Sequence, residues 1–133
     1  MKDITTEPVK TIKRAPFSVR ARLGSFRYAW EGLKAFFAGQ HNAIVHAVAT
    51  VVVIVLCFVV KLNPTELLVL TVVTGMVWIT ELLNTSIEKL CDLVSPGFNP
   101  KVKFIKDVAA AAVLVSAVMA VVAALIIFIP KFL

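Results

Sequence analysis

Residues 108–129 read VAAAAVLVSAVMAVVAALIIFI and contain no charged side chain. At a rise of about 1.5 Å per residue, a helix of this length crosses a hydrocarbon layer of about 30 Å. Two further apolar stretches, at 43–60 and 65–87, precede it and have similar reach. Of all residues, 59% are hydrophobic, against about 45 to 50% in ordinary soluble domains. The sequence therefore predicts an all-α membrane protein with three transmembrane helices, at about 43–60, 65–87 and 107–129.

The region before these stretches is basic and amphipathic. Eight of the 14 Lys and Arg residues lie within the first 42 positions of a chain whose net charge is +6. Between about 17 and 38, Phe26, Trp30 and Phe37 follow a helical spacing and basic side chains fill the remainder. This pattern is typical of a helix lying in the headgroup layer. We expect a disordered basic tail over 1–15 and a single membrane domain over 16–133.

The distribution of cations predicts how the chain crosses the membrane. Lys61 is the one cation between the first two apolar stretches, whereas the N-terminal region and the second loop are rich in Lys and Arg. The positive-inside tendency then predicts that the N-terminus and the second loop face the cytoplasm. We expect a multi-pass protein of the bacterial inner membrane without a cleavable signal peptide. Cys57 and Cys91 have no metal-ligand spacing and are interpreted as reduced packing residues.

Four polar side chains lie at the cytoplasmic end of the second apolar stretch. Glu81, Asn84, Glu88 and Asp92 are spaced by three, four and four residues, which places them on one helix face. An ionisable group inside a span costs about 2.5 to 3.5 kcal/mol, so each is a functional candidate. Acidic groups near a helix C-terminus also oppose the macrodipole, which predicts a compensating metal or basic partner. For Asp92 alone, a solvated helix end explains the residue equally well.

Lys106 and Asp107 begin the third predicted helix on the same side of the membrane. They are either ordinary charges of a helix start or part of a phosphate site built from an ammonium and backbone donors. His46 is expected to be a hydrogen-bonded residue between helices rather than a metal ligand. The sequence contains no Walker A loop, protein-kinase motif or zinc motif. Any phosphate site must therefore be built from membrane helices, and no nucleic-acid partner is expected.

These residues resemble the signature of the small prokaryotic integral membrane diacylglycerol kinases and the similar undecaprenol kinases. The resemblance covers about residues 25–114, and its most specific part is ELLNTSIE at 81–88, followed by Asp92. The step of eighteen residues from Glu88 to Lys106 also fits without a gap. The resemblance implies a homotrimer of three-span protomers with active sites between neighbours. It also implies a reaction between ATP, Mg²⁺ and a membrane lipid alcohol.

The resemblance implies a role for each matching residue. Glu81 would take the proton from the lipid hydroxyl, Asn84 would orient nearby groups, and Glu88 would bind magnesium. The nucleotide-binding residues would be Tyr28, Gln40, Glu88, Gly97, Phe98, Asn99, Lys106 and Asp107. The lipid would contact Glu81 and Ala110, with Asp92 in a supporting role.

One position departs from the family pattern. Gln40 stands where the family usually has a glutamate as a second metal ligand. An amide oxygen binds magnesium without the charge of a carboxylate, so the number of metals stays open. Arg20 and Arg22 both lie near the position of the family's N-terminal arginine, and neither aligns cleanly.

Several functions remain open from the sequence. Phosphorylation of diacylglycerol to phosphatidic acid and of undecaprenol to undecaprenyl phosphate are about equally supported, and the pairing of Asn42 with His46 favours the undecaprenol branch. A non-enzymatic channel or transport subunit could also use an acidic stripe to line a cation pathway. That reading leaves Lys106 and Asp107 unexplained. A pseudoenzyme weakened at Gln40 is a further alternative.

Overall fold

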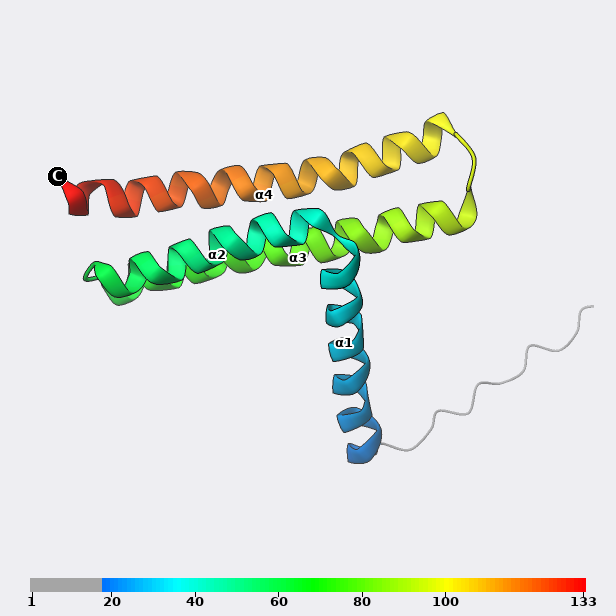
Figure 1. The fold of residues 1–133 in the computed structure, drawn as a ribbon, viewed down its shortest axis with the longest axis horizontal. Coiled ribbons are helices and arrows are strands. Elements are labelled where there is room, and N and C mark those ends of the chain that lie inside the picture. Colours follow the sequence, from blue (N-terminus) through cyan, green and yellow to red (C-terminus); the bar gives the residue numbers. More distant parts are fainter. Residues whose placement is uncertain (1–17) are drawn as a thin grey trace, which may run out of the picture. The chain divides into compact units, whose positions relative to one another are not determined.

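The computed structural model describes residues 18–133, and every regular element within them is a helix. The helices are α1 (Val19–Gly39), α2 (His41–Val59), α3 (Pro64–Val94) and α4 (Pro100–Phe132), as shown in Figure 1. Three of them, α2, α3 and α4, are long and apolar enough to cross a membrane. The predicted all-α membrane fold with three spanning helices and a further N-terminal helix is thus confirmed. The tail expected at 1–15 lies outside the described residues.

The described chain divides into two units, one that ends at Gly32 and one that covers Leu33–Leu133. In the described part of the first unit, Arg27 makes an ion pair with Glu31 at 3.3 Å, one helical turn further on. The Arg27 guanidinium also lies 5.6 Å from the centre of the Tyr28 ring. Phe26 and Trp30, one helical turn apart, are exposed, as expected for the apolar side of an amphipathic helix, and Tyr28 on another side of α1 is also exposed.

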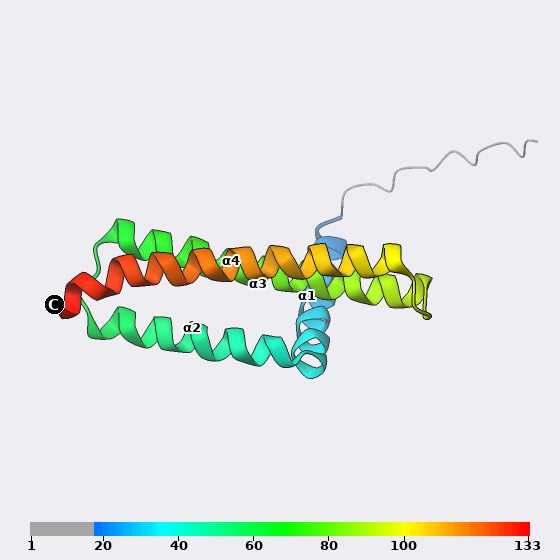
Figure 2. The same cartoon turned by 90° about the horizontal axis from the view of Figure 1, so that it is seen from above.

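Within the second unit, α3 runs beside α4 along much of its length, whereas α2 contacts α3 more sparsely. Figure 2 shows the same three helices from a second direction. Polar side chains link them inside the apolar layer. The Trp78 indole of α3 donates to the Thr50 hydroxyl of α2 at 3.1 Å. The Thr80 hydroxyl of α3 and the Ser116 hydroxyl of α4 lie 2.8 Å apart and hydrogen-bond.

Caps determine where the long helices begin, and the cap of α4 explains why this helix starts before its apolar stretch. Asn63 accepts from the Glu66 amide at 2.9 Å while the Glu66 carboxylate accepts from the Asn63 amide at 2.8 Å, which is a capping box. Asn99 caps α4 through the Lys101 amide at 2.9 Å. A proline follows each cap, where its missing N–H is harmless. Hydropathy locates the membrane layer, whereas these local contacts locate the starts of α3 and α4.

Much of the apolar surface of the spanning helices is uncovered. Phe58 on α2 is 87% exposed, and many valine, leucine and isoleucine side chains of α3 and α4 are also exposed. In lipid such surface is an ordinary outer face, or it packs against further helices. The buried interior is correspondingly small, and two of its members are the polar side chains Glu81 and Asn84.

Candidate active site

The polar residues of α3 pass from deep burial to exposure along one face of the helix. Glu81 is 1% exposed and Asn84 is 6% exposed. Glu88, one turn further on, is half-buried, and Asp92 is exposed. The predicted stripe thus runs from the interior of the helical unit to the end of α3 that leads into the loop before α4.

Glu81 is the largest fully buried side chain of the described residues. Its Oε2 atom has no hydrogen-bond partner among residues 18–133, and neither has the buried Oδ1 of Asn84. The nearest charged or titratable partner is His46, whose Nε2 lies 3.9 Å from Oε2. A buried acceptor without a donor costs about 1 to 3 kcal/mol, and more when it is charged. Two such oxygens one turn apart are a place where a donor or a cation is expected to bind.

Asn84 connects the buried and the accessible parts of this face. Its Nδ2 group donates to Glu88 Oε1 at 3.2 Å. The Asn84 amide therefore holds the Glu88 carboxylate while its own oxygen remains without a partner. The pair presents oxygen ligands, which are the ligands that magnesium prefers.

Lys106 joins the start of α4 to the end of α3, because its ammonium makes an ion pair with Asp92. The basic partner expected for the acidic stripe is therefore present for its outermost member. Asp107 makes a different contact and pairs with Lys103 on its own helix. Both side chains of the second pair are more than half exposed. The two adjacent predicted nucleotide residues thus have different partners, and only Lys106 reaches the polar stripe of α3.

The other predicted site residues occupy loops and helix ends. Gln40 precedes α2, is half-buried and makes no capping hydrogen bond through its side chain. Asn99 caps α4, and Phe98 is 84% exposed in the loop before it. The Gly97 carbonyl accepts from the Ser95 hydroxyl at 3.4 Å. Tyr28 belongs to the unit that ends at Gly32, and Ala110 is exposed on α4.

The donor set fits a magnesium ion that arrives with a nucleotide rather than one held by protein alone. Among residues 18–133, no three His, Cys, Asp or Glu side chains are grouped to hold a metal. Magnesium is commonly bound through one or two carboxylates together with substrate phosphates. Glu88, with Asn84 beside it, supplies such a partial set.

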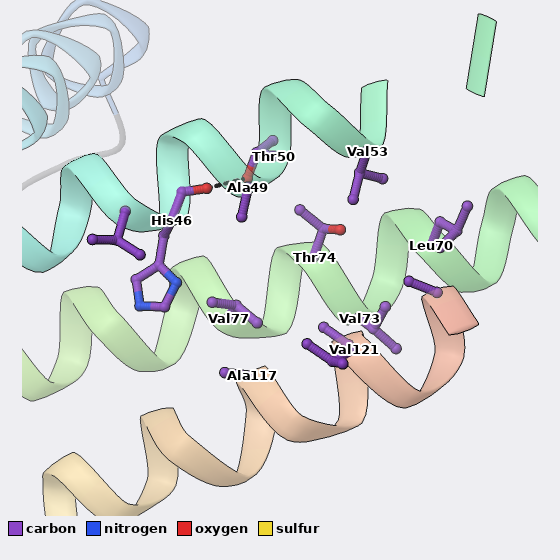
Figure 3. A pocket seen from close by; sticks show the side chains of 13 residues that line it. His46, Ala49, Thr50, Val53, Leu70, Val73, Thr74, Val77, Ala117 and Val121 are labelled. Atoms are coloured by element: carbon purple, nitrogen blue, oxygen red, sulfur yellow. Dashed lines mark hydrogen bonds between the residues drawn. The ribbon is translucent and has the colours of Figure 1, made fainter. Parts of the chain in front are cut away.

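A cavity of about 290 Å³ between α2, α3 and α4 was not predicted from the sequence. Figure 3 shows His46 and Val77 towards one end and Leu70 towards the other. Nearly all of the lining is apolar, and Thr50 and Thr74 add hydroxyl groups. Small residues of α4 form one wall, at positions 117, 120 and 124. Their helical spacing is the sequence signal that could have indicated a space between the helices.

Comparison with known proteins identifies the family. Residues 27–128 match the sequence profile described as prokaryotic diacylglycerol kinase. A diacylglycerol kinase of Synechocystis sp. is 41% identical over 101 residues, which are 75% of this chain and 58% of that protein. An undecaprenol kinase of Bacillus subtilis is 36% identical over 107 residues, which are 80% of this chain and 87% of that protein. The chain therefore spans little more than half of the Synechocystis relative and most of the Bacillus one. By the extent of the profile match, the chain belongs to the prokaryotic diacylglycerol kinase family.

Proposed function

We propose that this chain is a membrane lipid kinase that transfers the γ-phosphate of ATP to the hydroxyl of a lipid alcohol. The observation that carries the proposal is the buried Glu81 carboxylate, whose Oε2 lacks a hydrogen-bond partner, one turn from the Asn84–Glu88 pair. Both relatives are named as kinases of lipid alcohols. Family membership also favours an enzyme over the channel or transport subunit considered from the sequence.

Glu81 is the base in this proposal. Its carboxylate takes the proton of the lipid hydroxyl while the alcohol oxygen attacks the γ-phosphorus and the bond to the departing ADP breaks. Phosphoryl transfer depends mainly on alignment and on compensation of phosphate charge. A carboxylate within the apolar layer meets a hydroxyl that its own hydrocarbon tail holds near the membrane interface.

The residues around Glu81 align the reactants. Magnesium, when bound, offsets the charge of the β- and γ-phosphates. Glu88 is its protein ligand, with Gln40 as a weaker second ligand, and Asn84 orients the Glu88 carboxylate. The Lys106 ammonium leaves Asp92 to bind the phosphates. The rest of the nucleotide contacts Asp107 and the loop residues Gly97, Phe98 and Asn99.

The functional form in this proposal is a homotrimer with active sites shared between neighbouring protomers. Support comes from the exposed apolar faces of α2, α3 and α4, which offer surface for further helices. The N-terminus and the α3–α4 loop face the cytoplasm of a bacterial inner membrane, which is supported by the cations Lys89, Lys101, Lys103 and Lys106 around that loop. ATP is available on that side.

Two lipid alcohols fit the proposal, diacylglycerol and undecaprenol. The relatives bear both names at similar identity. The cavity between α2, α3 and α4 is apolar, and its end at His46 lies beside Glu81. Part of an acyl or polyprenyl tail fits there, with the hydroxyl near Glu81 and the rest of the tail along Ala110 on α4.

The proposal is tested by transfer of labelled phosphate from ATP into organic-soluble product. The purified full chain is reconstituted in bilayers with Mg²⁺ and either dioleoylglycerol, undecaprenol or glycerol, the last as a soluble alcohol control. We expect label in a lipid product and no label in glycerol phosphate, with the preferred lipid identified by its turnover. If neither lipid is labelled by protein that remains folded and assembled, the proposed function is wrong.

A further inference from the structure

We infer that His46 is a positioning residue for the Glu81 carboxylate. When the lipid alcohol binds, the Nε2–H group of His46 donates to Glu81 Oε2, so that the carboxylate presents its other oxygen to the lipid hydroxyl. The inference rests on the proposed role of Glu81 as the base. Nε2 and Oε2 lie 3.9 Å apart, which is beyond hydrogen-bond distance. Contacts of this kind often tighten only when substrate binds, and a shift of about 1 Å is enough here.

The burial of Glu81 makes this donor important. Oε2 has no hydrogen-bond partner among residues 18–133, and the side chain is 2% exposed. The His46 side chain is 17% exposed, so water has little access to the gap between them. A buried carboxylate without a donor is poorly stabilised. Among residues 18–133, His46 is the one ionisable donor within 4.0 Å of this oxygen.

The surroundings of the imidazole hold it in place. The Trp78 ring lies edge-on to the His46 ring, with centres 6.4 Å apart. Trp78 is fixed in turn, because its indole donates to Thr50 and its ring packs against Phe37 with centres 5.6 Å apart. The Thr50 hydroxyl donates to the His46 carbonyl at 2.7 Å, and Figure 3 shows this bond beside the imidazole. If the His46 ring only filled space, its Nε2 atom would not need to lie near the buried Glu81 carboxylate of α3.

Three variants separate positioning from packing. His46→Phe keeps a ring of similar size and removes the donor, whereas His46→Gln keeps an N–H group near the position of Nε2. His41→Phe is the matched control, because His41 is exposed at the start of α2. We expect His46→Phe to lower kcat about 10- to 100-fold, the range for loss of one hydrogen bond to a charged group, with little change in KM for ATP. His46→Gln should recover most of this loss, and His41→Phe should behave as wild type.

A second background tests whether the two residues act as a unit. In a Glu81→Gln protein, His46→Phe should add little further loss, because residues that act together are non-additive. Equal kcat for wild type and His46→Phe would overturn the inference while leaving the proposed kinase intact. Equal losses for His46→Phe and His46→Gln would also overturn it, because they would indicate packing alone.

A readout independent of activity keeps the inference testable even where no lipid is phosphorylated. The chain has 2 histidines, so the ¹⁵N spectrum of histidine-labelled protein in bilayers is simple, and His41→Phe assigns it. In the presence of a lipid alcohol, we expect Glu81→Gln to shift the His46 Nε2 resonance and to leave that of His41 unchanged. An unchanged His46 resonance overturns the inference. Absence of lipid phosphorylation together with the shift contradicts the role of Glu81 as a base and leaves the contact in place.

Discussion

Glu66 and Glu81 lie on the same helix, α3, and have opposite environments. Glu66 Oε2 accepts from the Asn63 amide at 2.8 Å and from Lys131 of α4 at 2.9 Å. Lys131 also donates to the Lys61 carbonyl at 3.1 Å, which fastens α4 to the turn before α3. Glu81 Oε2, in contrast, has no such donor within residues 18–133. A carboxylate that accepts hydrogen bonds from the protein stabilises the fold, whereas a carboxylate without such donors is available for chemistry.

The largest effect on activity is expected when Glu81 is exchanged for glutamine, and the same exchange at Glu66 is the comparison. Glu81→Gln should lower kcat by about 100- to 10,000-fold, the usual contribution of general base catalysis, because an amide cannot accept the proton. Its melting temperature should stay at or above that of wild type, since the buried charge is removed. Steady-state kinetics with a lipid alcohol and thermal unfolding in detergent measure both quantities.

Glu66→Gln is the matched control for that variant. It removes the charge that faces Lys131 and weakens the capping box, so the melting temperature should fall while kcat changes little. Near-normal turnover in Glu81→Gln, with the oligomer intact, would show that Glu81 is not the base.

Substitutions of Lys106 and Asp92 test whether the accessible end of the polar stripe binds phosphate. Lys106→Met should raise KM for ATP about 10- to 100-fold, as expected for loss of a charged hydrogen-bond donor. Asp92→Asn should lower KM for ATP by a smaller factor, because it frees Lys106 from its internal partner. Titration of initial rates with ATP measures both changes. A rise in KM with Asp92→Asn would indicate that Asp92 orients Lys106 for the nucleotide instead of competing with it.

Gln40 tests the metal ligands of the site. Gln40→Glu adds a carboxylate at the start of α2 and should lower the magnesium concentration needed for half-maximal activity several-fold. Activity measured against free Mg²⁺ at saturating ATP gives this value, and Gln40→Ala is the control for loss of the amide. If both variants need the same magnesium as wild type, Gln40 is not a ligand.

The smallest expected effect concerns a purely structural contact. Thr80→Val and Ser116→Ala each remove one hydroxyl of the pair between α3 and α4. A double-mutant cycle should give a coupling energy of about 0.6 kcal/mol, the average for hydrogen bonds between membrane helices. Unfolding free energies measured in mixed detergent supply the cycle, with kcat unchanged in all variants. A large loss of kcat in Thr80→Val would place this pair in the site.

Sequence reasoning predicted the number of spanning helices and the polar face of α3, because apolar length and helical spacing are read directly from residues. It did not predict that Lys106 and Asp107 have different partners, since adjacent residues on a helix point about 100° apart and only packing decides which one meets α3. The contact of His46 with Glu81 also depends on how α2 packs against α3. The hydroxyl pair of Thr80 and Ser116 was missed for the same reason.

The central claim is that the Glu81 carboxylate lacks a hydrogen-bond donor until a lipid hydroxyl reaches it. The most direct test is the ¹³C carboxyl spectrum of glutamate-labelled protein in bilayers, with Glu81 and Glu66 assigned by their glutamine variants. Addition of a lipid alcohol with magnesium and a non-transferable ATP analogue should shift the Glu81 carboxyl resonance and leave that of Glu66 in place. A Glu81 resonance that does not respond to any lipid alcohol would contradict the account.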